Sequence, residues 1–470
     1  MAKNPTDASV AIIVLAAGLG TRMKSKKAKV LHRAGGRTLI EHVVRMCRRV
    51  APPENVVVVV GHQAEQVQEA VRGYGVRFAV QKEQLGTGHA VMAAREAVEG
   101  RADYVAVLYG DGPLLEEATL RALIEKEQGS TAAAAIITTV LDDPTGYGRV
   151  ITDSEGRIQA VVEQKAATPE QLAIKVVNSG IYCFRAELLW KHITELTTDN
   201  PAGEYYLTDM VEVLRRAGHD VETMMVEDSS QLLGINTRVE LAVVDRILRE
   251  RKLREVMLAG VTVEKPETVT IDPDVEIGRD TIVGPFTQIL GRTKIGEDCV
   301  IGAGAVISDS ELADGVEVGP LTVIQDSKVG PGARIGPYAR LRFGNRIEAG
   351  AAVGNFVELK NAELGEGAKA LHLAYLGDAA IGPGVNVGAG TITCNYDGLK
   401  KHRTEVEAGA FIGSNSTLVA PVKIGEGGYV GAGSVITRDV PADSLALGRS
   451  RQVVKEGWAR ERRKKKGGDG

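Results

Sequence analysis

A short repeat dominates the second half of the chain, where an aliphatic residue followed by glycine returns many times, often six residues later. A period of six belongs to neither an α-helix nor an ordinary strand. It is typical of a hexapeptide β-helix, in which each hexad forms one flat side of a triangular coil. One hexad cannot bury its apolar side alone, so stacked coils must share one core. The pairs that predict this left-handed parallel β-helix are Ile277-Gly278, Val283-Gly284, Ile295-Gly296, Ile301-Gly302, Val329-Gly330, Ile335-Gly336, Val353-Gly354, Ile381-Gly382, Val387-Gly388, Ile412-Gly413, Ile424-Gly425 and Val430-Gly431.

The repeat defines a scaffold and not a reaction, so chemistry is expected where the repeat lapses. Its spacing slips between Gly354 and Gly382, a stretch that we interpret as an interruption of the β-helix. A histidine on its own is more often structural than catalytic, but polar neighbours at positions where a core pattern tolerates few favour a site here. Histidine suits a general base because its ordinary pKa, about 6.5, lies near neutral pH. The polar residues are Lys360, His372, Tyr375, Asn386, Asn395 and Tyr396.

Length and composition indicate a globular protein of two or three domains, since 44% of the 470 residues are hydrophobic. A formal net charge of -4 gives no reason to expect a nucleic-acid partner. The polar start, Met1 to Ser9, precedes an apolar run too short for a signal peptide, and no stretch approaches the roughly eighteen apolar residues that span a bilayer. We expect a cytoplasmic protein without membrane insertion. Its cysteines are expected to be reduced: Cys47, Cys183, Cys299 and Cys394.

The first half predicts an α/β domain with a mainly parallel, Rossmann-like sheet, because aliphatic runs alternate with amphipathic stretches. The expected strands are Val10 to Leu15, Val56 to Val60, Tyr104 to Tyr109 and Ala132 to Val140. Apolar residues from Arg238 to Ala259 have helical spacing, and the composition changes abruptly after Gly260. We therefore expect an N-terminal domain (1-236), a helical linker (237-260), a β-helix domain (261-458) and a basic, flexible tail (459-470), for which contact with a phosphorylated ligand is the alternative.

A glycine loop follows the first expected strand directly. The strand ends at Leu15 and continues into Ala16-Ala17-Gly18-Leu19-Gly20-Thr21-Arg22-Met23. Glycines let backbone N–H groups approach a phosphate closely, and the charges of Arg22 and Lys29 would suit a triphosphate. Met23 occupies the place of the third glycine of a dinucleotide fingerprint, and the ending of a Walker loop is missing, so neither of those motifs applies.

This string, L-A-A-G-x-G-T-R-M followed by Lys29, resembles the signature of sugar-nucleotide pyrophosphorylases. Further strings extend the resemblance: Gln81 to His89, Tyr109-Gly110-Asp111 and Gly234 to Arg238. Asp111 also follows the carboxyl end of an expected strand, where open α/β sheets bind ligands. The resemblance implies that Asp111 and Asn236 hold Mg²⁺. It implies substrate contacts from Leu15, Ala16, Ala17, Gly18, Lys29, Gln81, Gly86, Thr87, Tyr109, Gly110, Asp111, Gly148, Glu163, Asn178 and Asn236.

In such a reaction a sugar phosphate attacks the α-phosphorus of a nucleoside triphosphate, so charge must be neutralised on both the entering and the departing oxygens. Mg²⁺ with Arg22 and Lys29 would do this. The attacking phosphate is already an anion, so we expect no protein nucleophile or base, and positioning supplies most of the rate.

The stretch around His372 resembles the acetyltransferase domain of a bifunctional bacterial family, N-acetylglucosamine-1-phosphate uridyltransferase / glucosamine-1-phosphate N-acetyltransferase, and both halves of the chain match it. The resemblance implies that His372 takes a proton from the substrate amine, which attacks acetyl-CoA, and that Glu358 orients His372. It implies contacts to the amino-sugar phosphate from Arg342, Lys360, Tyr375, Asn386 and Lys401. It implies contacts to acetyl-CoA from Ala389, Asn395, Tyr396, Ser414, Ala432 and Arg449. Family members are homotrimers, and their product serves peptidoglycan and lipopolysaccharide synthesis.

We therefore expect an enzyme that transfers acetyl from acetyl-CoA to glucosamine 1-phosphate and then uridylyl from UTP. The main alternative is a sugar nucleotidyltransferase whose β-helix serves only assembly or regulation. If the chain were a purely structural repeat protein with a degenerate first domain, we would expect its charged motif residues to be replaced. All three are present: Arg22, Lys29 and Asp111. The chain departs from the family pattern at Ala28, Gly112 and Phe343, none of which removes a charged group or the expected base. The Arg449-Ser450-Arg451 string also differs from the family's usual arginine-apolar-proline ending.

Overall fold

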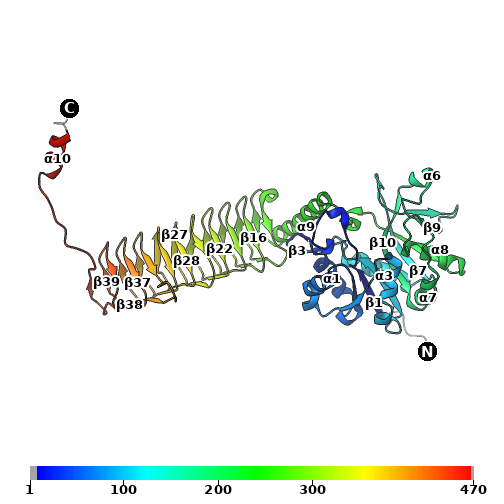
Figure 1. Ribbon diagram of the computed structural model, residues 1–470, viewed down its shortest axis with the longest axis horizontal. Coiled ribbons are helices and arrows are strands. Elements are labelled where there is room, and N and C mark those ends of the chain that lie inside the picture. Colours follow the sequence, from blue (N-terminus) through cyan, green and yellow to red (C-terminus); the bar gives the residue numbers. More distant parts are fainter. Residues whose placement is uncertain (1–7, 467–470) are drawn as a thin grey trace. The chain divides into compact units, whose positions relative to one another are not determined.

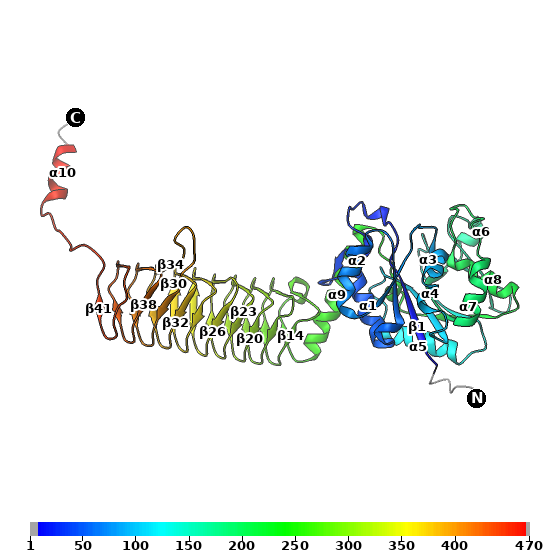
Figure 2. The same ribbon diagram turned by 60° about the horizontal axis from the view of Figure 1, so that its bottom comes forward.

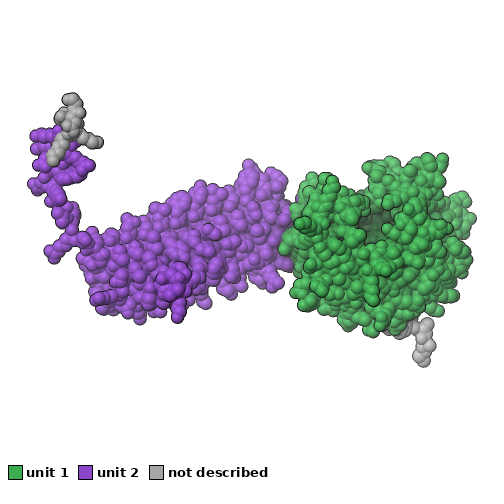
Figure 3. Space-filling view, viewed as in Figure 1, with its two compact units in different colours: residues 1–248 green, residues 249–470 purple. Residues whose placement is uncertain are grey.

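The computed structural model describes residues 8–466, which fall into two compact units that divide between Leu248 and Arg249 (Figure 3). The polar start of the chain as far as residue 7 and the last four residues of the expected tail lie outside the described residues. The division between the units falls within helix α9 (Arg238–Leu258), which confirms the helix expected from the sequence to within one residue. Each unit has its own core and is described separately below.

Unit 1 is built on a nine-stranded mixed sheet, in which seven strands follow the order β11-β7-β10-β6-β1-β4-β5. β1 pairs in parallel with both β4 and β6, whereas β10 runs antiparallel to β6 and β7. The expected strands are confirmed to within two residues, and β10 makes the sheet mixed. The strands are β1 (Val10–Leu15), β4 (Val56–Val60), β5 (Arg77–Val80), β6 (Tyr104–Tyr109), β7 (Ala134–Val140), β8 (Arg149–Thr152), β9 (Ile158–Val162), β10 (Val176–Arg185) and β11 (Val221–Met225). A separate hairpin joins β2 (Arg33–Ala34) and β3 (Arg37–Thr38).

Helices cover both faces of this sheet (Figure 1). Successive side chains of a strand point to opposite faces. Accordingly, Ile13 and Leu15 of β1 belong to one apolar cluster, and Ile12 and Val14 belong to another. Every residue from Ala11 to Leu15 is buried, as expected of a central strand between two helical layers. The helices are α1 (Leu39–Val50), α2 (Ala64–Val71), α3 (Thr87–Ala93), α4 (Arg95–Val98), α5 (Glu117–Gln128), α6 (Pro169–Leu172), α7 (Ala186–His192) and α8 (Met210–Arg216).

Unit 2 confirms the left-handed parallel β-helix (Figure 2). Three parallel sheets of 11, 10 and 9 short strands form its flat sides. They begin at β12 (Thr262–Val263), β13 (Thr270–Ile271) and β14 (Glu276–Ile277) and end at β41 (Leu445–Ala446), β40 (Val435–Ile436) and β38 (Val422–Ile424). Inward-facing residues of successive coils stack on one another, as Leu341, Leu359 and Leu376 do in the ten-stranded sheet. This shared core is what a lone hexad could not build.

The expected interruption between Gly354 and Gly382 is wrong. Strands β27 (Ala352–Asn355), β28 (Glu358–Lys360), β30 (Lys369–His372) and β31 (Tyr375–Gly377) continue the ladder without a break, and Glu358 pairs with Tyr375 seventeen positions later. The aliphatic-glycine pairs of this stretch carry leucine, at Leu364-Gly365 and Leu376-Gly377, and its other inward positions lack a following glycine. All inward positions remain small or aliphatic and buried, so the coils persist. The coil that does expand lies further on, where Ala379 pairs with Thr404 twenty-five positions later. The loop of residues 395–402 leaves the ladder in that coil.

One corner of the prism, between the eleven- and ten-stranded sheets, carries exposed apolar side chains on residues with positive φ. Tyr338 and Phe356 stack there with ring centroids 5.4 Å apart. A large apolar side chain in this strained backbone region is uncommon, and several together in solvent point to a covering partner. We call this set the apolar corner: Phe286, Leu321, Tyr338, Phe356 and Leu373.

The tail expected to be flexible begins with a helix, α10 (Trp458–Lys466), which is exposed as far as its side chains are described. Across residues 8–466, no helix is both long and apolar enough to cross a membrane.

Candidate active sites

A cavity of about 400 Å³ lies at the carboxyl ends of β1 and β6 in unit 1. The wall begins with the glycine loop that follows β1, continues through the loop before α3, and includes the end of β6. Ten of the residues that the sequence nominated meet here: Leu15, Ala16, Ala17, Gly18, Lys29, Gln81, Gly86, Thr87, Tyr109 and Asp111. Strings far apart in sequence thus converge at the sheet edge where parallel strands place ligands.

The glycines of this cavity serve different purposes. Gly86 has a φ of +110°, and an added Cβ would lie 2.5 Å from the Tyr205 carbonyl oxygen, so the chain itself requires glycine there. Gly18 differs, because a Cβ on it would meet no protein atom within 4 Å. Packing within the described protein therefore does not require glycine at position 18. The absence of a side chain leaves open space against the backbone, where a ligand can approach.

Four polar side chains form a charged cluster at the entrance to the cavity. Lys29 makes an ion pair with Asp111 and also donates a hydrogen bond of 3.3 Å to Oδ1 of Asn236. Arg22 donates to the same oxygen at 2.8 Å. Two side chains with oxygen acceptors and two cationic side chains therefore lie in contact, although Asn236 lies more than 200 residues from Lys29 in sequence. Gly110 supports the cluster through its backbone, since its N–H donates to the Leu15 carbonyl.

The residues expected to contact the sugar also come together. The Asn178 N–H donates to the Gly148 carbonyl at 2.9 Å, and Gly148 lies against the Glu163 carboxylate. Burial raises the pKa of Glu163, the nearby Glu204 carboxylate raises it further, and the Thr208 hydroxyl opposes the shift by donating to Oε1 at 3.3 Å. A carboxyl group in this position can form hydrogen bonds with sugar hydroxyls.

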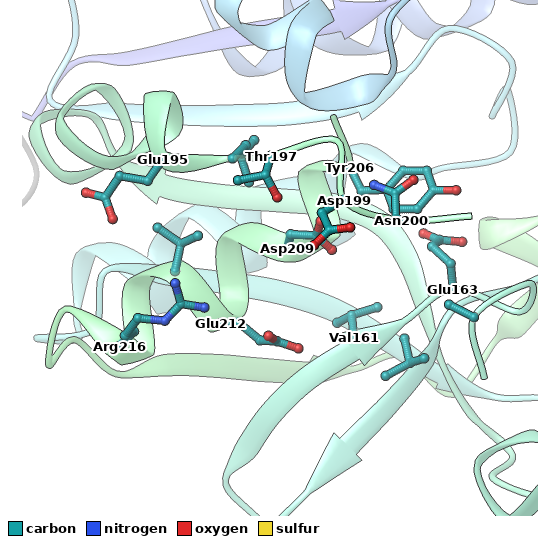
Figure 4. Close-up of a pocket in the computed structure, with 14 residues that line it drawn as sticks. Val161, Glu163, Glu195, Thr197, Asp199, Asn200, Tyr206, Asp209, Glu212 and Arg216 are labelled. Carbon is teal, nitrogen blue, oxygen red and sulfur yellow. The ribbon is translucent and has the colours of Figure 1, made fainter. Parts of the chain in front are cut away.

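A second cavity of about 280 Å³ adjoins Glu163 (Figure 4). Five carboxylates line it, and burial together with Glu212 and Glu163 raises the pKa of Asp209 to about 6. It was not expected from the sequence, because its acidic residues come from separate loops and helical segments. They are Glu163, Glu195, Asp199, Asp209 and Glu212.

In unit 2, His372 belongs to a column of residues that occupy the same position in successive coils. The Gly390 N–H donates to the His372 carbonyl, the Asn415 N–H to the Ala389 carbonyl, and the Gly433 N–H to the Ser414 carbonyl. Four nominated residues therefore stack next to the corner, and Arg449 lies beside Gly433 at the far end. The column runs through Asn355, His372, Ala389, Ser414 and Ala432. Its small residues leave a strip along which an extended ligand could lie.

A cationic cluster lies at the end of the ten-stranded side that adjoins the nine-stranded side, where β28 ends at Lys360. Lys360 approaches Lys401 of the expanded coil, and this contact between like charges lowers the pKa of Lys360. Lys360 and Arg342 both lie over the ring of Phe343, with their charged atoms 5.5 and 5.6 Å from its centroid. Crowded cations of this kind suit an anion such as a phosphate.

Asp378 joins this cluster to the residues expected to bind acetyl-CoA. It accepts hydrogen bonds from Asn361 at 2.7 Å and from Asn395. Partial burial opposes ionisation of Asp378, but these two amides and the neighbouring lysines lower its pKa overall. The Tyr375 hydroxyl and the Asn395 amide both lie over Gly377.

Some nominated residues are not neighbours within one chain. Glu358 contacts Arg342 at 3.2 Å, and the side chain that meets the His372 imidazole is Asn355. Asn386 begins β33 (Asn386–Val387) in the eleven-stranded sheet, on a different side of the prism from Arg342. Sequence reasoning missed Asn355 and Asp378, and it missed Glu204 in the wall of the larger cavity. No motif marks these three residues; only coil register or the folded loop reveals them.

Fold and sites together define a nucleotidyltransferase joined to a hexapeptide-repeat acyltransferase. The family of the MobA-like NTP transferase domain matches residues 12–260. The family of the bacterial transferase hexapeptide (six repeats) matches residues 274–309 and 403–438.

Curated relatives match along nearly the whole chain. The bifunctional protein GlmU of Solibacter usitatus is 60% identical over 453 residues, which cover 96% of this chain and 97% of the relative. The bifunctional protein GlmU of Koribacter versatilis is 49% identical over 461 residues, covering 97% of this chain and 98% of the relative. This chain belongs to the bifunctional GlmU family. The predicted enzyme with a uridyltransferase and a glucosamine-1-phosphate acetyltransferase activity is confirmed.

Proposed function

We propose that the two sites catalyse consecutive steps. Unit 2 transfers acetyl from acetyl-CoA to the amine of glucosamine 1-phosphate, and unit 1 transfers uridylyl from UTP to the resulting N-acetylglucosamine 1-phosphate. The observation that carries the division is the column of His372 together with a cationic cluster, because an inert scaffold requires neither. Both co-substrates are cytoplasmic metabolites, so we place the enzyme in the cytoplasm, which cell fractionation tests.

In the acetyl-transfer step, the amine nitrogen attacks the thioester carbon, a C–N bond forms and the C–S bond breaks. Nε2 of His372 takes the amine proton, and the departing thiolate of coenzyme A receives a proton in turn. Arg342, Lys360 and Lys401 hold the sugar phosphate, with Tyr375 beside them. Acetyl-CoA lies along the strip of Ala389, Ser414 and Ala432, reaching Asn395, Tyr396 and Arg449.

In the uridylyl-transfer step, a phosphate oxygen of the sugar phosphate bonds to the α-phosphorus of UTP, and the bridging oxygen leaves with pyrophosphate. Arg22 and Lys29 neutralise the charge that develops. The open space over Gly18 accepts the phosphates, Gln81, Gly86 and Thr87 hold the uracil, and Gly148, Glu163 and Asn178 hold the amino sugar. The attacking group is an anion, so the step requires positioning rather than a base.

We assign a Mg²⁺ site to Asp111 and Asn236. The proposal is supported by the Lys29 ammonium, which contacts an oxygen of each residue, so that both oxygens face one positive charge. Within residues 8–466, no cluster of three or more His, Cys, Asp or Glu side chains could hold a metal. That suits Mg²⁺, which uses one or two protein ligands with water and substrate phosphates. When bound, Mg²⁺ supplies a Lewis acid for the phosphate oxygens.

We further propose that three chains assemble through the apolar corner. Within one chain, Asn386 lies on a different side of the prism from Arg342 and Lys360, so a neighbouring copy is needed to complete the acceptor site. Exposed aromatic and aliphatic side chains next to the His372 column offer a surface that such a copy would bury.

Phe356→Glu should convert the trimer to single chains, because the charge would be buried against apolar neighbours on assembly. Sedimentation equilibrium measures the mass. Val239→Glu is the matched control, since Val239 is exposed in unit 1 and should leave the mass of three chains unchanged. An unaltered mass for Phe356→Glu would show that the corner is not the interface.

The order of the two steps is tested with glucosamine 1-phosphate, acetyl-CoA, UTP and Mg²⁺, while free thiol and pyrophosphate are followed separately. Thiol should appear first and pyrophosphate after a lag, and omission of acetyl-CoA should suppress both. N-acetylglucosamine 1-phosphate with UTP should release pyrophosphate at once. Release of pyrophosphate without any release of thiol would favour a β-helix that serves only as a scaffold. If thiol is released but pyrophosphate also appears at once from glucosamine 1-phosphate and UTP without acetyl-CoA, the proposed order is reversed.

A further inference from the structure

The imidazole of His372 meets the side-chain amide of Asn355, one coil earlier in the same column. Oδ1 of Asn355 lies 3.0 Å from Nδ1 of His372. The contact follows from coil register, since β27 and β30 pair in parallel with Asn355 opposite His372. A carbonyl oxygen can only accept, so this contact requires the proton on Nδ1 and leaves the lone pair of Nε2 free.

We propose that Asn355 is a positioning residue that holds His372 in the tautomer required of a base. The proposal rests on the proposed role of His372 in acetyl transfer. A ring that flipped or changed tautomer would present an N–H to the amine in place of a lone pair. Because His372 is exposed in one chain, no tight packing holds its ring, and the amide supplies that constraint.

The choice of an amide has a chemical consequence. A carboxylate in the same place would also fix the tautomer, but its charge would stabilise the imidazolium and raise the pKa of the base. A neutral amide orders the ring without placing a charge beside it. The strands packed against β30 add no competing charge, because β27 and β33 contain no ionisable residue. On β30 itself, Lys369 is the only ionisable residue besides His372.

Two substitutions separate ordering from charge. Asn355→Asp keeps the acceptor and adds the charge, so kcat for acetyl transfer at high pH should stay within about twofold, while the acid limb of its pH profile moves up by about one unit. Asn355→Ala removes the acceptor, so kcat should fall about tenfold with the KM for acetyl-CoA unchanged. Uridylyl transfer, measured on the same full-length preparations, should not change in either variant and reports correct folding.

An acid limb that stays in place in Asn355→Asp, or full activity in Asn355→Ala, would overturn the proposal. His372→Ala is measured alongside them to distinguish the two assignments. If His372→Ala loses acetyl transfer while the acid limb of Asn355→Asp stays in place, only the role of Asn355 is wrong. If His372→Ala retains acetyl transfer, the base itself is wrongly assigned, and the role of Asn355 falls with it.

Discussion

His372→Ala should lower the kcat of acetyl transfer by about a hundredfold to ten-thousandfold, because the amine would lose the group that takes its proton. His372 is the only histidine in its column, which runs through Asn355, His372, Ala389, Ser414 and Ala432, so no other imidazole in the column can substitute for it. Release of free thiol from acetyl-CoA, with glucosamine 1-phosphate as acceptor, measures the loss.

Uridylyl transfer should be intact in the same variant, because the larger cavity is built from residues of unit 1 alone. His372→Asn is a second variant that keeps a polar side chain of similar shape but cannot act as a base near neutral pH. It should be as inactive in acetyl transfer as His372→Ala. Equal loss of both activities in either variant would indicate a folding defect and refute the two-site assignment.

Asp111→Asn should lower uridylyl transfer about a hundredfold when Mg²⁺ is limiting, with partial recovery as its concentration rises. The amide is nearly the same shape as the carboxylate, but it lacks the charge that attracts the ion, and it also releases Lys29 from its ion pair. Initial rates of pyrophosphate release over a range of Mg²⁺ concentrations measure the effect.

The matched control for this variant is Asp142→Asn. Asp142 lies in the same unit, is fully exposed and pairs only at the surface with Lys175, so its charge should be of little consequence. Acetyl transfer should be unchanged in both variants. If Asp111→Asn showed the same Mg²⁺ dependence as the unchanged protein, Asp111 would not be a metal ligand.

Much of the fold follows from local periodicity, and so the sequence predicts it well. The aliphatic runs of β1, β4 and β6 have the bounds expected of them, and α9 ends within one residue of its expected end. The antiparallel β10 could not be foreseen, because strand direction depends on the connections around it. The predicted interruption is wrong because the prediction treated glycine as essential to each side of a coil. A small or aliphatic inward residue is sufficient, as at Leu359 and Ala370.

The candidate sites were predictable to the extent that their residues sit in motifs. The strings around Gly18, Gln81 and Asp111 converge on one cavity because each follows a strand of the same sheet. Contacts between coils were not predictable in the same way. Whether His372 meets Glu358 or Asn355 depends on a register of seventeen residues between successive coils, which the six-residue pattern alone does not reveal.

The expanded coil has a consequence for how this enzyme could be altered. Ile392 still pairs with Thr417, and Cys394 with Val419, so the strands close in register around the loop of residues 395–402 as if it were absent. Lengthening such a loop costs little in closure entropy. The tip of the loop, residues 397–400 beyond the bridge between Tyr396 and Lys401, is therefore a replaceable module on a fixed frame. Its exchange offers a way to recruit new acceptor molecules without redesigning the prism or removing Asn395, Tyr396 and Lys401.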